Sequence, residues 1–101
     1  MRQALYQGNH PKIAESLYNV GAVYDTLDYI FEALKYQKKA LKMRQALYQG
    51  NHPQIANSLG NIGAAYNTLG YTSEGLKYTE KSLKMYKALY RDNHPKIALS
   101  L

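Results

Sequence analysis

The chain contains no cysteine, and this absence excludes three kinds of chemistry together. A chain without thiols forms no disulfide bond, offers no thiolate to a metal ion and has no cysteine nucleophile. It also lacks a run of about 18 apolar residues, the length that a membrane-spanning helix needs. Residues Met1 to Leu5 lack the apolar core of a secretion signal. We therefore expect a cytoplasmic protein with no membrane segment.

Prolines and acidic residues are also few. The sequence has 3 prolines and is 46% hydrophobic, so it has enough apolar surface to fold. Its 101 residues leave room for one small domain or a few stacked repeats, and not for a large catalytic cleft. With 7 acidic against 13 basic residues the net charge is +6, which suits acidic partners, nucleic acid included.

The sequence repeats itself with a period of about 42 residues. The segment Met1–Pro11 returns unchanged as Met43–Pro53, and in altered form as Met85–Pro95. Periods of this length are typical of stacked helical repeats. We expect a single array over 1–101: the end of a preceding helix at 1–10, repeats at 11–52 and 53–94, and the start of a further helix at 95–101.

Apolar residues follow the helical spacing of three and four in two stripes per repeat. The first stripe contains Ile13, Leu17, Val20, Gly21, Tyr24 and Leu27, and in the second copy Ile55, Leu59, Ile62, Gly63, Tyr66 and Leu69. The other contains Ala33, Leu34, Gln37, Ala40, Leu41, Ala46 and Tyr48, then Gly75, Leu76, Leu83 and Tyr90. The spacing predicts helices at 11–27, 30–48, 53–69 and 72–90, each burying its stripe.

Three residue types mark the break between repeats. Glycine can take the left-handed conformation that follows a helix, and proline suits the first turn of the next helix. The histidine before each proline can cap that helix. Since successive histidines should lie about 16–20 Å apart, they cannot share a zinc ion, and we expect no metal site. These residues are Gly8 and Gly50, then His10, His52 and His94, and Pro11, Pro53 and Pro95.

The pattern Leu17-x-x-Val20-Gly21-x-x-Tyr24, followed by Glu32-Ala33 and Ala40-Leu41, resembles the tetratricopeptide repeat signature. The second copy, Leu59-x-x-Ile62-Gly63-x-x-Tyr66, extends the resemblance over essentially the whole chain. The long period and the Gly-Asn-His-Pro linker are similar to the subtype found in kinesin light chains. The resemblance implies an all-α fold, an α-solenoid of antiparallel helix pairs in a right-handed superhelix.

Some positions depart from the family pattern. Asp28 stands where an inter-helix glycine is usual, and Ile30 and Thr72 stand where an aromatic is usual. Gly75 replaces a small alanine, which should cost about 1 kcal/mol of helix stability. We expect Gly21 and Gly63 to let paired helices approach closely. Most tyrosines, at helical spacing, should be core: Tyr24, Tyr29, Tyr36, Tyr66, Tyr71 and Tyr78.

The resemblance also implies that the first helix of each pair lines a concave groove that binds extended peptides. The groove face carries Glu15, Tyr18, Asn19, Ala22, Asp25 and Thr26, and in the second copy Asn57, Gly60, Asn61, Ala64, Asn67 and Thr68. Asn19 and Asn61 match the asparagine that bonds a peptide backbone or terminal carboxylate in such families. An amide suits this task because it both donates and accepts.

Two further features of the groove shape the expected ligand. Tyr18, which becomes Gly60 in the next copy, is a candidate aromatic contact. The helix carries Glu15 and Asp25 where carboxylate-binding relatives have lysine or arginine, so we expect no ligand with an acidic tail. The alternative is that Asn19 and Asn61 only bond neighbouring helices.

We expect no catalytic residue and no cofactor. The repeated serines, Ser16, Ser58 and Ser100, have no histidine and aspartate arranged as partners, and no glycine-rich phosphate loop is present. The basic residues lie mainly on the second helix of each pair, where a solvated face is the simplest explanation. These are Lys35, Lys38, Lys39, Lys42, Lys77, Lys81 and Lys84.

The sequence thus predicts a protein–protein interaction scaffold that binds a peptide of unknown identity. One alternative is an architectural segment of a larger protein that stacks with itself. Asn93–Leu101 matches Asn9–Leu17, so the first helix of a second copy could take its place, head to tail. The other alternative is weak binding of acidic partners or nucleic acid by the lysines, but no interleaving of arginine with aromatic residues supports nucleic acid.

Overall fold

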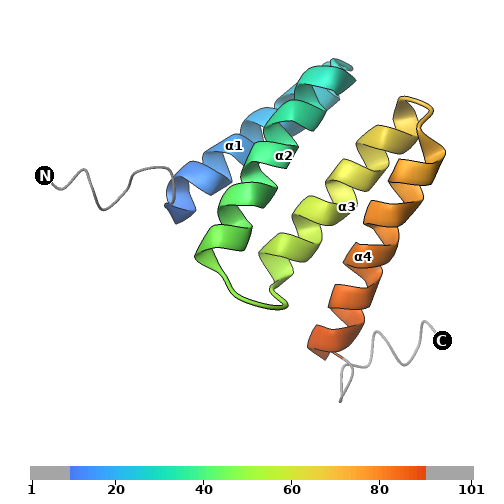
Figure 1. Ribbon diagram of the computed structural model, residues 1–101. Coiled ribbons are helices and arrows are strands. Elements are labelled where there is room, and N and C mark those ends of the chain that lie inside the picture. The colour runs from blue at the N-terminus through green and yellow to red at the C-terminus, as the bar shows by residue number, and fades with distance from the viewer. Residues whose placement is uncertain (1–9, 91–101) are drawn as a thin grey trace, which may run out of the picture.

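A computed structural model describes residues 10–90, which form four helices and no strand. The helices are α1 (Pro11–Thr26), α2 (Ile30–Leu47), α3 (Pro53–Thr68) and α4 (Thr72–Tyr90). Helix α1 packs against α2, α3 packs against α4, and α2 joins the two pairs through α3 (Figure 1). Each expected helix ends within one residue of the observed one, and the all-α solenoid is confirmed. The helix fragments expected within 1–9 and 91–101 lie outside the described residues, as do Gly8, His94, Pro95, Ser100 and Leu101.

The first helix of each pair begins with a histidine cap. The Nδ1 atom of His10 accepts a hydrogen bond of 3.0 Å from the backbone N–H of Lys12. His52 accepts one of 3.1 Å from Gln54 in the same way. The ring of His52 also stacks on Tyr48, with centroids 3.7 Å apart. Because these bonds satisfy N–H groups that a helix start leaves unpaired, the predicted capping role is confirmed.

Left-handed backbone occurs where the chain turns. Gly50 has a φ of 69°, as expected for the break between repeats. Gly70 has a φ of 93° in the turn between α3 and α4. Asp28, at the equivalent position between α1 and α2, has a φ of 71°. The aspartate therefore adopts a conformation that usually requires glycine, and the turn keeps its shape.

Glycines allow the paired helices to approach closely. A Cβ atom on Gly21 would lie 2.6 Å from the Nε2 atom of Gln37, and one on Gly63 would lie 2.9 Å from the carbonyl oxygen of Gly75. The expected role of Gly21 and Gly63 is confirmed. Gly75 is buried, and a Cβ atom there would lie 3.0 Å from the carbonyl oxygen of Gly63. The glycine that is expected to cost helix stability therefore also allows α3 and α4 to approach closely.

The buried core lies at the junction between the two pairs. It is one cluster made of Leu34 and Leu41 from α2 with Ile55, Leu59, Ile62 and Ala65 from α3. Neighbouring side chains, such as Tyr66 and Met85, are partly buried against it. The core therefore holds α2 and α3 in a fixed relation, and with them the surface between α1 and α3.

The expectation that every stripe is buried is wrong for the outer helices. Ile13 in α1 is 41% exposed, whereas Ile55 at the same repeat position in α3 is 3% exposed. Leu76 in α4 is 56% exposed, whereas Leu34 in α2 is 8% exposed. The reason is that, within the described residues, α1 and α4 each pack mainly against one helix and α2 and α3 against two. The other exposed members of the stripes are Val20, Leu27, Ala46 and Leu83.

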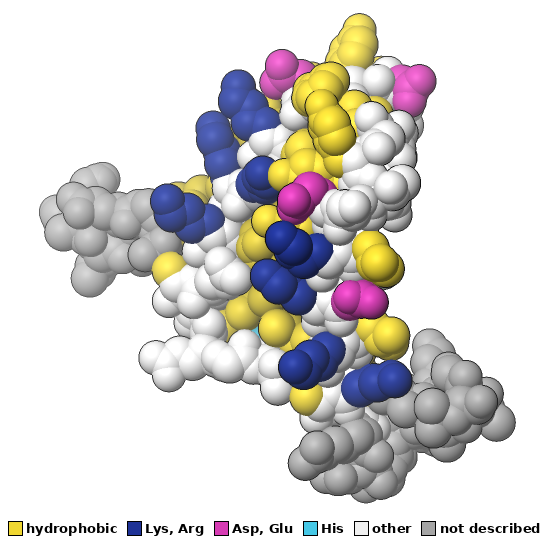
Figure 2. Space-filling model, turned by 45° about the vertical axis from the view of Figure 1, so that its right-hand side comes forward, with side chains coloured by type: hydrophobic (Ala, Val, Ile, Leu, Met, Phe, Trp, Pro, Cys, Tyr) yellow, Lys and Arg dark blue, Asp and Glu magenta, His cyan; other side chains and the backbone are white. Residues whose placement is uncertain are grey.

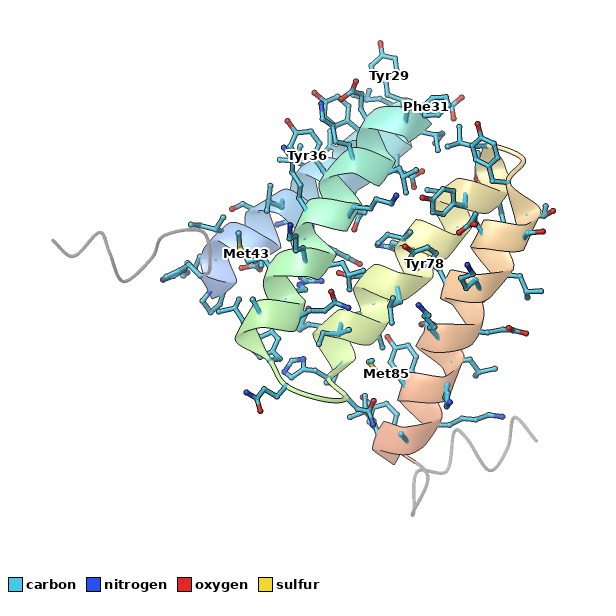
Figure 3. The ribbon with its side chains drawn as sticks, in the orientation of Figure 1. Tyr29, Phe31, Tyr36, Met43, Tyr78 and Met85 are labelled. Atoms are coloured by element: carbon cyan, nitrogen blue, oxygen red, sulfur yellow. The ribbon has the colours of Figure 1, made fainter. Side chains whose placement is uncertain are left out.

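Four of the tyrosines form two stacked pairs between paired helices. Tyr24 stacks on Tyr36, and Tyr66 stacks on Tyr78, each with ring centroids 5.6 Å apart. All four rings are half-buried, and Tyr66 and Tyr78 pack against the core cluster. Tyr29 and Tyr71 are exposed, so the predicted core role is wrong for these two. Figure 3 shows Tyr29 projecting from the end of the first helix pair.

Candidate functional site

The candidate site is the surface between α1 and α3, which contains two hollows. The larger has a volume of about 400 Å³ and lies between the start of α1, the end of α2 and the start of α3. The smaller has a volume of about 160 Å³ and lies where α1, α2 and α3 meet further along the same surface. Pocket volumes of a few hundred Å³ suit a side chain or a short stretch of a ligand.

The larger hollow brings together three of the predicted site residues. Glu15, Tyr18 and Asn19 line it from α1, together with Pro11, Lys12, Arg44, Tyr48 and Gln54. Glu15 and Asn19 are exposed and Tyr18 is half-buried. The hollow therefore contains an amide, an aromatic ring and two basic groups within one concave surface.

Arg44 is the central side chain of this hollow. It comes from α2 and is only 5% exposed. Its Nη1 atom donates to the carbonyl oxygen of Gln54 at 3.2 Å and to the hydroxyl of Ser58 at 3.0 Å. Its guanidinium carbon lies 4.5 Å from the centroid of the Tyr18 ring, a cation–π contact. One side chain thus joins α2 to both α1 and α3.

Within residues 10–90, no ion pair balances the charge of Arg44. Burial lowers the pKa of its guanidinium, although the nearby Tyr18, Tyr48 and Glu15 act in the opposite direction. Arginine nevertheless stays protonated at neutral pH, because its ordinary pKa is far above 7. The ion pairs among residues 10–90 are Lys35 with Glu32 and Lys77 with Glu74, each at 3.9 Å. A buried cation without a carboxylate partner is costly, so an anionic group in the hollow would be stabilised.

Most of the other predicted residues line the smaller hollow. Ala22, Asp25, Asn61, Ala64 and Thr68 line it, together with Ala33, Gln37 and Ala65. Asn61 is half-buried. Gln37 donates from Nε2 to the carbonyl oxygen of Tyr18 at 3.1 Å, and its Oε1 atom is buried without a partner among the described residues. Polar and small side chains therefore alternate along the floor of the surface from one hollow to the next.

Three of the predicted polar side chains, and Gly60, lie outside both hollows. Asn57 accepts a hydrogen bond from the hydroxyl of Tyr86. Asn67 lies beside Gly75 and lines a separate hollow against α4. Thr26 lies at the end of α1 and donates its hydroxyl to the carbonyl oxygen of Ala22 at 3.0 Å. The structure thus places these three away from Asn19 and Asn61.

Arg44 and Lys12 are the residues that the sequence analysis missed. The sequence-based expectation for the groove rests on Glu15 and Asp25 of the first helix, whereas Arg44 from the second helix of the pair and Lys12 also line the larger hollow. The burial of Arg44 could have been predicted from the sequence. Arg44 follows Leu41 by three residues and precedes Tyr48 by four, so it belongs to the buried stripe of its helix.

The lysines of α2 and α4 cover another face of the molecule. Figure 2 shows basic side chains spread along this face, with hydrophobic side chains between them. The amino groups of Lys38 and Lys39 lie 5.1 Å from the ring centroids of Tyr66 and Tyr36, respectively. A hydrogen bond to Tyr66 is the main reason why the pKa of Lys38 is raised. These lysines are exposed, as the sequence predicts, but they are interleaved with aromatic rings.

Residues 10–90 contain neither a candidate membrane span nor a candidate metal site. No helix in that range combines the length and the apolarity needed to cross a bilayer. No group of three or more histidine, aspartate or glutamate side chains within the described part could hold a metal ion. The histidine atoms that cap α1 and α3 are already engaged.

Comparison with known proteins gives the family. Residues 30–88, more than half of the chain, match the tetratricopeptide repeat. No curated protein matches the chain. Among solved structures, it is similar to the crystal structure of BtubC (BKLC) from P. vanneervenii, with a TM-score of 0.79 and 22% identity over 92% of this chain. The match covers 37% of BtubC, so this chain spans little more than a third of that protein, and the likeness concerns the fold. The chain belongs to the tetratricopeptide repeat family, as its sequence predicts.

Proposed function

We propose that this protein is a binding scaffold that holds an extended peptide along the surface between α1 and α3. Tetratricopeptide repeats generally mediate contacts between proteins. The observation that carries the proposal is the larger hollow, where the Asn19 amide, the Tyr18 ring and the buried guanidinium of Arg44 meet. An amide can bond a peptide backbone, a ring can contact an apolar side chain, and a guanidinium can bond a carboxylate.

Each hollow would bind a different part of the ligand. Asn19 in the larger hollow and Asn61 in the smaller one would each bond the backbone of the same extended ligand. Arg44 and Lys12 would hold an acidic group of the ligand, against the expectation drawn from Glu15 and Asp25. Glu15 lines the same hollow and would repel that group, which limits the gain. We therefore favour a peptide with one acidic residue over a strongly acidic one.

The test compares the Asn19→Ala, Asn61→Ala double variant with the wild type. The probe is a peptide selected against the wild-type protein from a displayed random library. Losing two hydrogen bonds should weaken its binding by about tenfold or more, at about 1 kcal/mol for each bond. Asn19 is exposed, and Asn61, although half-buried, lines a hollow. The melting temperature of the double variant should therefore hardly change. Gln49→Ala, in the exposed loop after α2, is the control.

The opposite pattern would favour the alternative role of the two asparagines. If they only bond neighbouring helices, the double variant would lose melting temperature and keep its affinity for the peptide. That result would remove the backbone-binding role from Asn19 and Asn61.

A second candidate function is head-to-tail stacking of copies, favoured by the exposed stripes of the outer helices. Val20 of α1 is 39% exposed and Leu83 of α4 is 54% exposed, yet the matching positions, Ile62 and Leu41, are in the core. Helix α1 of one copy could therefore pack on α4 of the next, as α3 packs on α2. Such a contact joins two different surfaces, so it would give open stacks instead of a closed dimer.

Light scattering during size exclusion tests the stacking. The wild type should show a mass that grows with concentration, whereas a Val20→Glu, Leu83→Glu double variant should stay monomeric. A wild-type mass that stays monomeric at millimolar concentration would contradict this second candidate and leave the peptide groove untouched.

A further inference from the structure

Another hollow lies between α2 and α4, away from the surface between α1 and α3. Its volume is about 460 Å³, and it lies above the start of α3. Leu41 and Leu59 form part of its lining, and both belong to the buried core cluster. Tyr78 and Met85 of α4 line it as well and are partly buried against that cluster. The hollow therefore opens directly onto the hydrophobic core.

The rim of this hollow is basic. Lys81 and Lys84 line it from α4, and both are exposed. The amino group of Lys81 lies 5.5 Å from the centroid of the Tyr78 ring, and both residues line the hollow. The described residues that line the hollow include no aspartate and no glutamate. Figure 3 shows Tyr78 and Met85 on the side of α4 that faces α3.

We infer that this hollow is a second binding site, for a peptide segment with one large apolar side chain flanked by carboxylates. The apolar floor favours a side chain such as leucine, because burying it removes apolar surface from water. The two lysines favour carboxylates on either side of that side chain. The volume lies within the range of ordinary ligand pockets, which are apolar with a few polar groups.

The basic rim and the apolar floor of the hollow together favour a peptide over other ligands. A nucleic acid strand would satisfy the lysines through its phosphates but would leave the apolar side chains of Met85 and Ala88 uncovered. A purely apolar ligand would fill the floor and leave the lysines without partners. A peptide is the occupant that fits both features, and the family to which the chain belongs makes contacts with proteins. The scaffold would then hold one ligand on each side of its core.

The experiment is a titration followed by the methyl resonances of Leu41, Leu59 and Met85 in nuclear magnetic resonance spectra. The probes are three acetylated and amidated five-residue peptides. The first has leucine between two pairs of glutamates, the second has alanine in place of the leucine, and the third has glutamines in place of the glutamates. The first peptide should shift the three methyl groups and bind at least about fivefold more tightly than the other two.

Charge-reversal variants separate the rim from the rest of the molecule. Lys81→Glu with Lys84→Glu should weaken binding of the first peptide by about tenfold. The control is Lys39→Glu with Lys42→Glu, which has the same residue types and spacing on α2 but does not line the hollow. All four lysines are exposed, so folding should be kept. At physiological salt the control should have little effect, because exposed charges are screened over about 8 Å.

Three results would overturn the inference. The first is equal binding of the glutamate and glutamine peptides. The second is an unchanged affinity in the Lys81→Glu, Lys84→Glu variant. The third is a short oligothymidine that shifts the lysine resonances of α4 while the first peptide shifts none of the methyl groups. None of these would affect the groove between α1 and α3, which is tested with Asn19 and Asn61.

Discussion

Gly63 and Gly75 face each other where α3 crosses α4, and each fills the space that a side chain on the other would need. A Cβ atom on Gly63 would lie 2.9 Å from the carbonyl oxygen of Gly75, and a Cβ on Gly75 would lie 3.0 Å from the carbonyl oxygen of Gly63. Neither atom can move without moving a helix, because both are backbone. This reciprocal contact sets the distance between the two helices.

The first prediction follows from that contact. Gly63→Ala should lower the free energy of unfolding by about 1–3 kcal/mol, because overpacking forces the backbone apart. Gly60→Ala, one turn earlier in α3, is the control. Its Cβ would meet only the Ser82 side chain, at 3.3 Å from the hydroxyl. A gain in helix propensity of about 1 kcal/mol opposes that crowding, so stability should change little. Urea unfolding of both variants measures the difference, and equal effects would contradict the close approach.

The second prediction uses two isoleucines at the same repeat position. Ile55→Ala should destabilise the protein by about 2–5 kcal/mol, because the side chain is buried in the core. Ile13→Ala should cost less than about 1 kcal/mol, because Ile13 is exposed on α1. Thermal and urea unfolding compare the two variants. Equal losses would mean that Ile13 is covered, for example by a second copy, and repeating the measurement over a range of concentrations would reveal that.

The third prediction concerns the turn between paired helices. Asp28→Gly should stabilise the protein by about 0.5–1 kcal/mol, because glycine adopts a φ of 71° without the steric cost that aspartate bears. The reciprocal change, Gly70→Asp, should destabilise by a similar amount. A Cβ on Gly70 meets nothing within 4 Å, so only the backbone conformation is tested there. Melting temperatures that move in the same direction in both variants would contradict this account.

Much of the fold could be predicted because its signals are local. In the Gly-Asn-His-Pro segment, Gly50 adopts the left-handed conformation that follows a helix, and His52 caps the next helix. Pro53 suits the first turn of that helix. Each of these acts through its own backbone or its nearest neighbours, as the His52 cap shows. The helix boundaries therefore follow directly from the printed sequence.

The burial of the outer helices could not be predicted in the same way. Ile13 and Ile55 have similar sequence surroundings, and they differ in exposure only because α3 has a helix on each side. The site illustrates the same limit. The position of Asn19 on the groove face follows from the periodicity of α1 alone. Arg44 lies on α2, so its place in the same hollow depends on how α1, α2 and α3 pack together.

The most direct test of the central claim is to map the surface that the library-selected peptide contacts on the wild-type protein, using nuclear magnetic resonance with assigned backbone and side-chain resonances. Peptide binding between α1 and α3 should shift the side-chain amides of Asn19 and Asn61 and the Nε–H of Arg44. Shifts confined to the lysine-bearing surfaces of α2 and α4 would contradict the proposed groove.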